Sequence, residues 1–150
     1  MTDEAENLSV ALFSEIFMAD QLARAKLARV LPRGMELNHF SVLNHLAKSK
    51  VEKTPGQLAR TFHVTRGAMT NTVNKLAWSG FVHIRPDWDD GRRKFVAISP
   101  AGRRACDEAF ESVAPVISEL ISAVGTENVR AVLPILRLIR SSLDEPDLGG

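Results

Sequence analysis

The side chains best suited to chemistry in this sequence gather in two stretches, residues 65–75 and 90–94. In the first stretch, arginine, threonine and asparagine recur at helical spacing. These residue types read base edges in a major groove, because arginine pairs with guanine, asparagine pairs with adenine and a threonine methyl group packs against thymine. Thr65, His63 and Lys75 are better suited to holding phosphates than to reading bases. The candidate base readers are Arg66, Thr70, Asn71 and Asn74, with Gly67 on the same face.

These residues need a helix that projects from the fold, and residues 54–81 predict one. The sequence TPGQ at residues 54–57 combines a threonine cap, a proline at the first helical position and a glutamine that satisfies the amides of a helix start. Residues 63–65 make a turn and cap a second helix, which Gly80 ends. Two helices joined by a short turn, the second of them polar outside, are typical of a helix-turn-helix. The apolar stripe of the second helix comprises Met69, Val73, Leu76 and Ala77.

A β-hairpin is predicted directly after this motif. Residues 81–85 and 95–98 alternate like strands, and a turn cluster, PDWDDG at residues 86–91, separates them. Arg92, Arg93 and Lys94 lead into the second strand. A hairpin that follows a helix-turn-helix makes the winged variety of the motif.

The distribution of charge favours a polyanionic partner. The net charge of the whole chain is only +1, but residues 48–104 hold 12 basic and 4 acidic residues, a net charge of +8. Residues 1–47 carry −2 and residues 105–150 carry −5. Because the basic segment coincides with the predicted helix-turn-helix and wing, the expected partner is double-stranded DNA.

Apolar helices are predicted on both sides of the basic segment. Residues 8–31 contain neither proline nor glycine and are apolar over more than one stripe, a second helix covers residues 36–49, and two more follow residue 99. The first helix is either the core of a monomer or the contact of a homodimer. We favour the homodimer, because residues 34–104 already have the elements of a complete small domain. Pro115 and Pro134 fall inside the last two helices, where kinks are expected.

The predicted fold is therefore mainly α with a small β-hairpin. It consists of an N-terminal dimerisation helix (residues 1–34), a winged helix-turn-helix DNA-binding domain (residues 35–99), and C-terminal dimerisation helices with a polar tail (residues 100–150).

Other functional classes find little support. The sequence has neither a glycine-rich phosphate loop nor a G-x-S-x-G motif, so we expect neither an enzyme nor a cofactor. The four histidines match no i, i+4 ligand pair, and Cys106 is a lone cysteine, so no metal site is expected. Cys106 is either a redox sensor or a packed thiol, and its mixed-charge neighbours favour the packed thiol. No apolar run approaches the roughly 20 residues of a membrane span, and the acidic N-terminus is unlike a signal peptide. A cytoplasmic protein without a membrane partner is expected.

The wing carries the most specific family resemblance. Residues 90–102, DGRRKFVAISPAG, resemble the D-x-R-x-x-x-V-x-L-T-x-x-G run of the MarR family of bacterial transcriptional regulators, with Ile98 for leucine and Ser99 for threonine. Residues 58–59 (LA) and 76–85 (LAWSGFVHIR) are similar to two further elements of that family. The resemblance covers residues 35–104, and the flanking helices match in length and placement only.

The resemblance implies a homodimer whose recognition helices enter successive major grooves of a palindromic operator. It gives Arg92 the place of the family's DNA-contacting arginine in the minor groove and Asp90 that of the acidic residue that orders the wing. It also implies a repressor released by a small aromatic effector bound between the dimer region and the DNA-binding lobes. The alternative is a winged-helix module that docks proteins without sequence-specific DNA binding, and the +8 segment argues against it.

Overall fold

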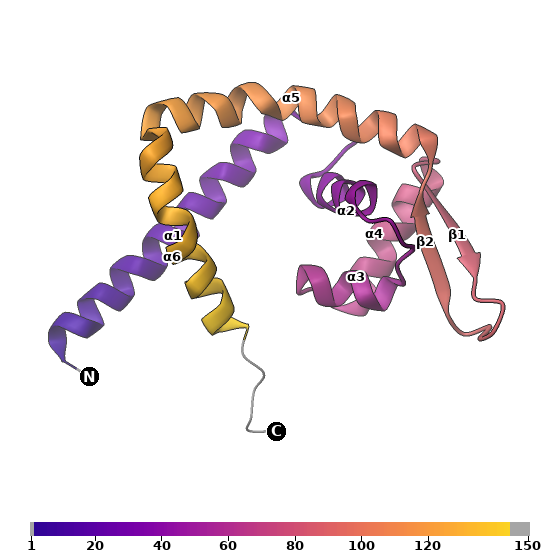
Figure 1. Ribbon diagram of the computed structural model, residues 1–150, viewed down its shortest axis with the longest axis horizontal. Helices are drawn as coiled ribbons and strands as arrows, with labels where there is room; N and C mark the ends of the chain where they lie inside the picture. The colour runs from indigo at the N-terminus through magenta and orange to yellow at the C-terminus, as the bar shows by residue number, and fades with distance from the viewer. Residues whose placement is uncertain (1, 145–150) are drawn as a thin grey trace. The chain divides into compact units, whose positions relative to one another are not determined.

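The computed structural model describes residues 2–144 as six helices and a two-stranded antiparallel sheet (Figure 1). In chain order the elements are α1 (Asp3–Val30), α2 (Leu37–Lys48), α3 (Pro55–Phe62), α4 (Arg66–Trp78), β1 (Val82–Pro86), β2 (Lys94–Ile98), α5 (Pro100–Val124) and α6 (Thr126–Leu143). The chain divides into two compact units between Val113 and Ala114. The first contains α1 to β2 and the beginning of α5, and the second contains the end of α5 and α6. The predicted class, mainly α with one hairpin in a winged helix-turn-helix arrangement, is confirmed.

One hydrophobic core joins α2, α3, α4 and the hairpin, which lie close together in Figure 1. Leu43, Leu58 and Val96 are completely buried in it. The strands pair in the register Val82↔Ile98 to Pro86↔Lys94. The segment before α3 forms a short antiparallel bridge to β2, in which Lys53 and Val96 exchange two backbone hydrogen bonds of 3.2 and 2.7 Å. This connection fixes the wing to the first helix of the helix-turn-helix motif.

The helix-turn-helix forms where the sequence predicts it, through local capping. Thr54 accepts a hydrogen bond from the Gln57 amide (3.1 Å), and the Gln57 side chain accepts one from the Thr54 amide (2.9 Å). His63 ends α3 in the left-handed region (φ 54°), and Thr65 caps α4 by accepting from the Ala68 amide (3.1 Å). Gly80 has φ 78°, as a helix stop of this kind requires.

Ser99 and Gly102 join the end of the wing to the end of α4. The Ser99 hydroxyl donates to the Gly80 carbonyl (2.6 Å) and accepts from the Gly102 amide (3.0 Å), so a single buried side chain caps α5 and holds the turn after α4. A Cβ atom on Gly102 would lie 2.0 Å from the carbonyl oxygen of Phe81. Only glycine allows this approach, which explains why a serine and a glycine stand three residues apart here.

Two boundaries differ from the sequence-based expectations. Helix α1 begins at Asp3 rather than near residue 8, because Thr2 accepts a hydrogen bond from the Ala5 amide (3.2 Å) and extends the helix. Pro115 and Pro134 lie inside α5 and α6, where the sequence placed them, and both helices continue through these residues. The predicted polar tail begins later than expected, because α6 continues to Leu143, and the rest of that tail, residues 145–150, lies outside the described residues.

Helices α1 and α6, called the outer helices below, contrast with this core. Within the described residues, neither α1 nor α6 has a buried side chain. Leu31, just after α1, is buried and packs against Ala109 and Val113 of α5 within the first unit. Among residues 2–144, no helix is both long enough and apolar enough to cross a membrane.

Candidate nucleic-acid interface

Helix α4 buries one face in the core and exposes the other. Every residue that the sequence assigned to this interface on α4 is exposed, from Thr65 and Arg66 to Lys75. The buried face consists of Met69, Thr72, Val73 and Leu76. Thr72 was missed as a core residue, because a threonine in a polar helix reads as another surface group. The exposed interface residues are Thr65, Arg66, Gly67, Thr70, Asn71, Asn74 and Lys75.

The buried hydroxyl of Thr72 connects the start of α2 to the middle of α4. It donates to the Ala68 carbonyl (3.1 Å) and accepts from the Asn38 amide group (3.3 Å). Asn38 in turn accepts from the backbone amide of His39 (3.0 Å). The register of α4 is thus tied to α2 by polar contacts as well as by apolar packing.

The exposed face of α4 borders two separate hollows. The larger, with a volume of about 620 Å³, lies between α4 and the connection from α1 to α2. Asn71, Asn74 and Lys75 line it, together with His39 and Trp78. Trp78, at the end of α4, is 94% exposed, so an indole ring with almost no packing stands at the edge of this hollow.

His39 is the buried polar group of the larger hollow. Its Nδ1 accepts from the Glu36 amide (3.2 Å), so the proton of the neutral ring belongs on Nε2. Nε2 is buried and has no hydrogen-bond partner among the described residues. Burial lowers the pKa of His39, which outweighs the raising effect of Glu36. The ring is therefore an uncharged donor for which the described residues offer no acceptor.

The smaller hollow, of about 240 Å³, brings the start of α4 to the wing. Arg66 and Thr70 of α4 share it with the three basic residues that lead into β2, Arg92, Arg93 and Lys94. The two stretches of candidate residues, which are well separated in the sequence, therefore meet at this point. The sequence predicted both groups but could not show that only Arg66 and Thr70 of α4 face the wing.

The wing tip is organised by main-chain hydrogen bonds to aspartates. Asp90 accepts from the backbone amide of Arg92 through its side chain (3.0 Å) and from that of Arg93 through its carbonyl (3.0 Å). The Asp90 carboxylate also lies 3.6 Å from Nε of Arg92, whose side chain is 95% exposed. Asp87 donates its amide to the Arg93 carbonyl (3.0 Å) and closes the turn. Asp90 thus has the geometry to order the main chain of the tip more than the Arg92 side chain.

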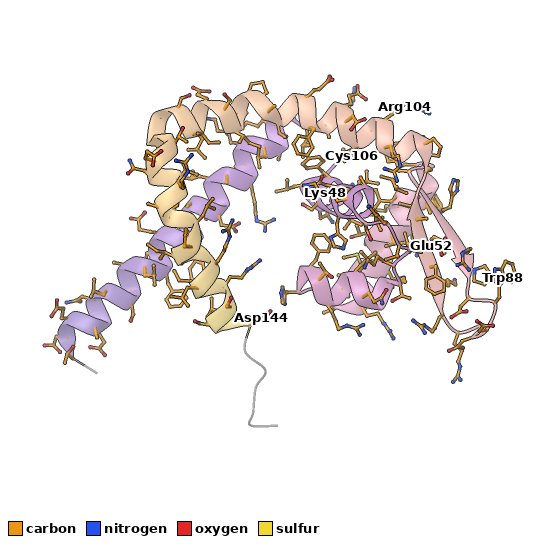
Figure 2. The ribbon with its side chains drawn as sticks, viewed as in Figure 1. Lys48, Glu52, Trp88, Arg104, Cys106 and Asp144 are labelled. Atoms are coloured by element: carbon orange, nitrogen blue, oxygen red, sulfur yellow. The ribbon has the colours of Figure 1, made fainter. Side chains whose placement is uncertain are left out.

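An ion pair that the sequence did not indicate holds the base of the wing. Arg85 of β1 contacts Glu52 through two nitrogen–oxygen pairs, 3.1 Å from Nε and 2.6 Å from Nη2. Its guanidinium lies 4.8 Å from the centre of the Phe95 ring, and that of Arg93 lies 5.8 Å from the same ring. Figure 2 shows Glu52 beside the strands and Trp88 at the far tip of the hairpin. Glu52 and Arg85 are far apart in sequence, so no local pattern could have paired them.

Two further chemical roles, a redox-active Cys106 and a metal site, can be compared with the structure. Cys106 is buried, and this burial raises the pKa of its thiol, so the side chain is packed and protonated at neutral pH. Residues 2–144 contain no group of three or more His, Cys, Asp or Glu side chains placed to hold a metal ion. The arrangement that remains is a projecting polar helix beside a basic wing. Such a surface can contact a phosphate backbone and base edges at the same time.

Comparison with known proteins agrees with this geometry. The family model described as MarR family matches residues 33–93. The chain is 26% identical over 104 residues to YdgG, an HTH-type transcriptional regulator of Bacillus subtilis, and the match covers 68% of each chain. It is 27% identical over 109 residues to the transcriptional activatory protein BadR of Rhodopseudomonas palustris, covering 68% of this chain and 62% of BadR.

Solved structures extend the similarity over almost the whole chain. The transcriptional regulator BldR from Sulfolobus solfataricus is 28% identical, with a TM-score of 0.81 over 95% of this chain and 99% of BldR. A cysteine-to-serine mutant of MarR from E. coli, complexed with operator DNA, is 24% identical and shares the fold, with a TM-score of 0.79 over 89% of this chain and 96% of that one.

Proposed function

We infer the function of this chain from its family: it belongs to the MarR family of winged-helix transcriptional regulators, and we propose that it regulates transcription by binding DNA as a homodimer. The observation that carries the proposal is the smaller hollow, where the start of α4 and the basic end of the wing face one common space. A helix and a hairpin so placed can occupy a major groove and the adjacent minor groove together.

In this proposal α4 is the recognition helix. Asn71 and Asn74 are exposed near the middle of its face and are the strongest candidates for adenine contacts. Thr65 and Lys75, at the two ends of that face, hold phosphates. Arg92 enters the minor groove, where a narrow A·T-rich stretch concentrates negative potential, and Arg93 and Lys94 contact the neighbouring backbone.

The homodimer is proposed from the exposed apolar side chains of the outer helices. Leu8, Phe17 and Leu22 of α1 are each more than 60% exposed, as is Leu138 of α6. Apolar surface of this extent on a single chain marks an interface. We assign it to residues 1–34 and 100–150, whereas residues 35–99 contact DNA. A symmetric dimer requires a palindromic operator, because each lobe reads one half-site.

We propose that a small aromatic effector regulates DNA binding. The larger hollow supports it, since the exposed Trp78 ring, the Lys75 cation and the His39 imidazole line it together. A bound effector there would cover Asn71 and Asn74 and release the DNA, as expected of a repressor. We therefore propose that the chain is a cytoplasmic repressor, whereas the name of its relative BadR records transcriptional activation.

Selection of bound fragments from random duplex DNA tests the core of the proposal. The expected result is an enriched palindrome, with half-sites about one helical turn apart. Binding to it should weaken steeply as salt increases, because phosphate contacts release counterions. The absence of any enriched palindrome, with binding that does not respond to salt, would instead favour a module that docks proteins.

A further inference from the structure

Arg66 does not extend from α4 in the way a base reader would. Its guanidinium group folds back over the start of α3, against Gly56, which is buried. A Cβ atom built on Gly56 would lie 2.6 Å from Nη2 of Arg66 and 3.4 Å from its Cζ and Nε. The arginine therefore occupies the space that the missing Gly56 side chain leaves. No positive φ requires glycine at this position, so Arg66 is the neighbour that a side chain there would disturb.

The folded-back Arg66 side chain lies at the hollow between α4 and the wing. Three further cations, Arg92, Arg93 and Lys94, line the same hollow, and so does the hydroxyl of Thr70. The described residues that line it include no aspartate or glutamate. Four cations line a hollow of about 240 Å³, and only Arg92 has a carboxylate beside it, that of Asp90 at 3.6 Å, which does not line the hollow. The remaining excess of positive charge favours an anion there.

Contacts at the base of the wing support one side of this hollow. Glu52 holds Arg85 by the paired contacts of 3.1 and 2.6 Å, and the Arg85 guanidinium lies over Phe95. Arg93 lies 5.8 Å from the same ring. The Phe95 ring thus lies beside Arg93, and the absence of a side chain on Gly56 leaves the space in which Arg66 lies. Two cations from elements distant in sequence are directed to one place by their surroundings.

We propose that this hollow is an oxyanion seat for a single backbone phosphate of the DNA, with Arg66 as its clamp and Gly56 as the residue that positions the clamp. The inference rests on the DNA binding proposed above. A recognition helix and a wing in adjacent grooves stand on either side of one sugar–phosphate strand. The hollow between them is where that strand passes. Arg66 then contributes affinity for every sequence and does not read a base.

Arg66→Ala tests the clamp on two probes, a random-sequence duplex and the duplex enriched by selection. We expect binding to both to weaken by a similar factor, about tenfold, because one charge-assisted contact is lost. The salt slope should fall by about one, since one fewer phosphate is neutralised. Arg60→Ala is the matched control, because Arg60 is an exposed arginine of α3 that does not line the hollow. A loss confined to the selected duplex would overturn the inference and return Arg66 to base reading.

A scan of the selected duplex with single neutral methylphosphonates locates the seat. For the wild-type chain, one position on the strand between the two contacted grooves should weaken binding, and for Arg66→Ala the same substitution should have little further effect. A scan in which no position couples to Arg66 would overturn the seat while leaving DNA binding intact. Failure of the wild-type chain to bind any duplex would overturn both proposals. If inorganic phosphate at constant ionic strength competes through Arg66 while the scan is flat, the anion is a free one and not DNA.

Gly56→Ala separates positioning from folding. The variant keeps every charge but displaces the Arg66 guanidinium, so it should weaken binding in the wild-type background. In the Arg66→Ala background the same change should have no further effect on binding. Thermal unfolding should show both Gly56 variants folded, because the displaced atoms belong to the end of a flexible side chain. Equal losses from Gly56→Ala in the two backgrounds would contradict the positioning role.

Discussion

The winged lobe (residues 35–99) and the two outer helices, α1 and α6, differ in how far they bury their apolar side chains. In the lobe, Leu43, Leu58 and Val96 are completely buried in one core shared by helices and hairpin. In α1 and α6, none of the described residues is buried, although α1 is rich in leucine and phenylalanine. The lobe is complete as a single chain, whereas each outer helix presents an apolar surface that needs a cover.

This difference supports the proposal that two kinds of function lie in different parts of the chain. The complete lobe leaves its polar α4 face and its basic wing exposed, which suits a charged partner such as DNA. The incomplete helices expose apolar surface, which suits a second copy of a protein. The following experiments test that distinction, beginning with the largest expected effect.

Two leucine-to-alanine substitutions compare the regions directly. Leu43→Ala should lower the free energy of unfolding by about 3–5 kcal/mol, because Leu43 is fully buried and its loss leaves a cavity. Leu22→Ala removes the same atoms from a residue that is 63% exposed. Its effect should grow with protein concentration, because it acts through self-association. Urea titrations at two concentrations measure both, and a large loss for Leu22→Ala independent of concentration would place Leu22 in a monomer core.

A charge on α1 should break the dimer without unfolding the lobe. Leu22→Glu would place a carboxylate in an apolar interface, at a cost of roughly 3 kcal/mol. Sedimentation at micromolar concentration should then show a monomer, where we expect the wild-type chain to be a dimer. Gln21→Glu is the control, because it adds the same charge at an exposed polar position next in sequence. A wild-type chain that sediments as a monomer would contradict the symmetric-site proposal.

Within the lobe, Asn71→Ala should relax specificity. Binding to the preferred base at one position in each half-site should weaken by roughly 1–3 kcal/mol, because a bidentate base contact is lost. Lys75→Ala should weaken all sequences about equally, as expected for a phosphate contact. Binding measured on the selected site and on random duplexes separates the two effects. Equal losses for Asn71→Ala on both duplexes would remove it from the base readers.

The wing tip offers two neighbouring residues with different effects. Asp90→Ala removes a negative charge but also the acceptor of the Arg92 amide, so the tip must be ordered on contact, at about 1–2 kcal/mol per fixed residue. We expect weaker binding with an almost unchanged salt slope. Arg92→Ala should weaken binding and lower the slope by about one. Measurements across a salt series decide, and tighter binding by Asp90→Ala would show that this residue does not pre-order the wing.

The smallest expected effect is a pH dependence of the stability of the lobe. Burial lowers the pKa of His39 below its ordinary value of 6.5, so the unfolded chain binds its proton more readily than the folded chain. Stability should therefore be complete above about pH 6.5 and decrease as the pH falls below it. His39→Gln should flatten that decrease, whereas His83→Gln, at an exposed position, should not. A slope that persists in His39→Gln would assign it to another group.

The sequence by itself determined the helix-turn-helix and its wing. Thr54 and Thr65 cap their helices and Gly80 stops α4, because each of these contacts is made within a few residues of sequence. The hairpin was predictable for the same reason, since its turn cluster lies between two short apolar strands. The outer helices were found as elements, but the contribution of Thr2 to the start of α1 was not recognised.

Tertiary structure alone decided how those elements place the candidate functional side chains. In the sequence, the polar residues of α4 form one surface. In the fold, Asn71, Asn74 and Lys75 line the larger hollow, whereas Arg66 and Thr70 line the smaller one. The folding of Arg66 over Gly56 and the pairing of Glu52 with Arg85 depend on segments that only the fold brings together. The backbone hydrogen bonds of helices, caps and hairpin turns join residues that are close in sequence, so a local sequence pattern indicates them. Which side chain meets which depends instead on the packing of distant segments, and no local pattern records it.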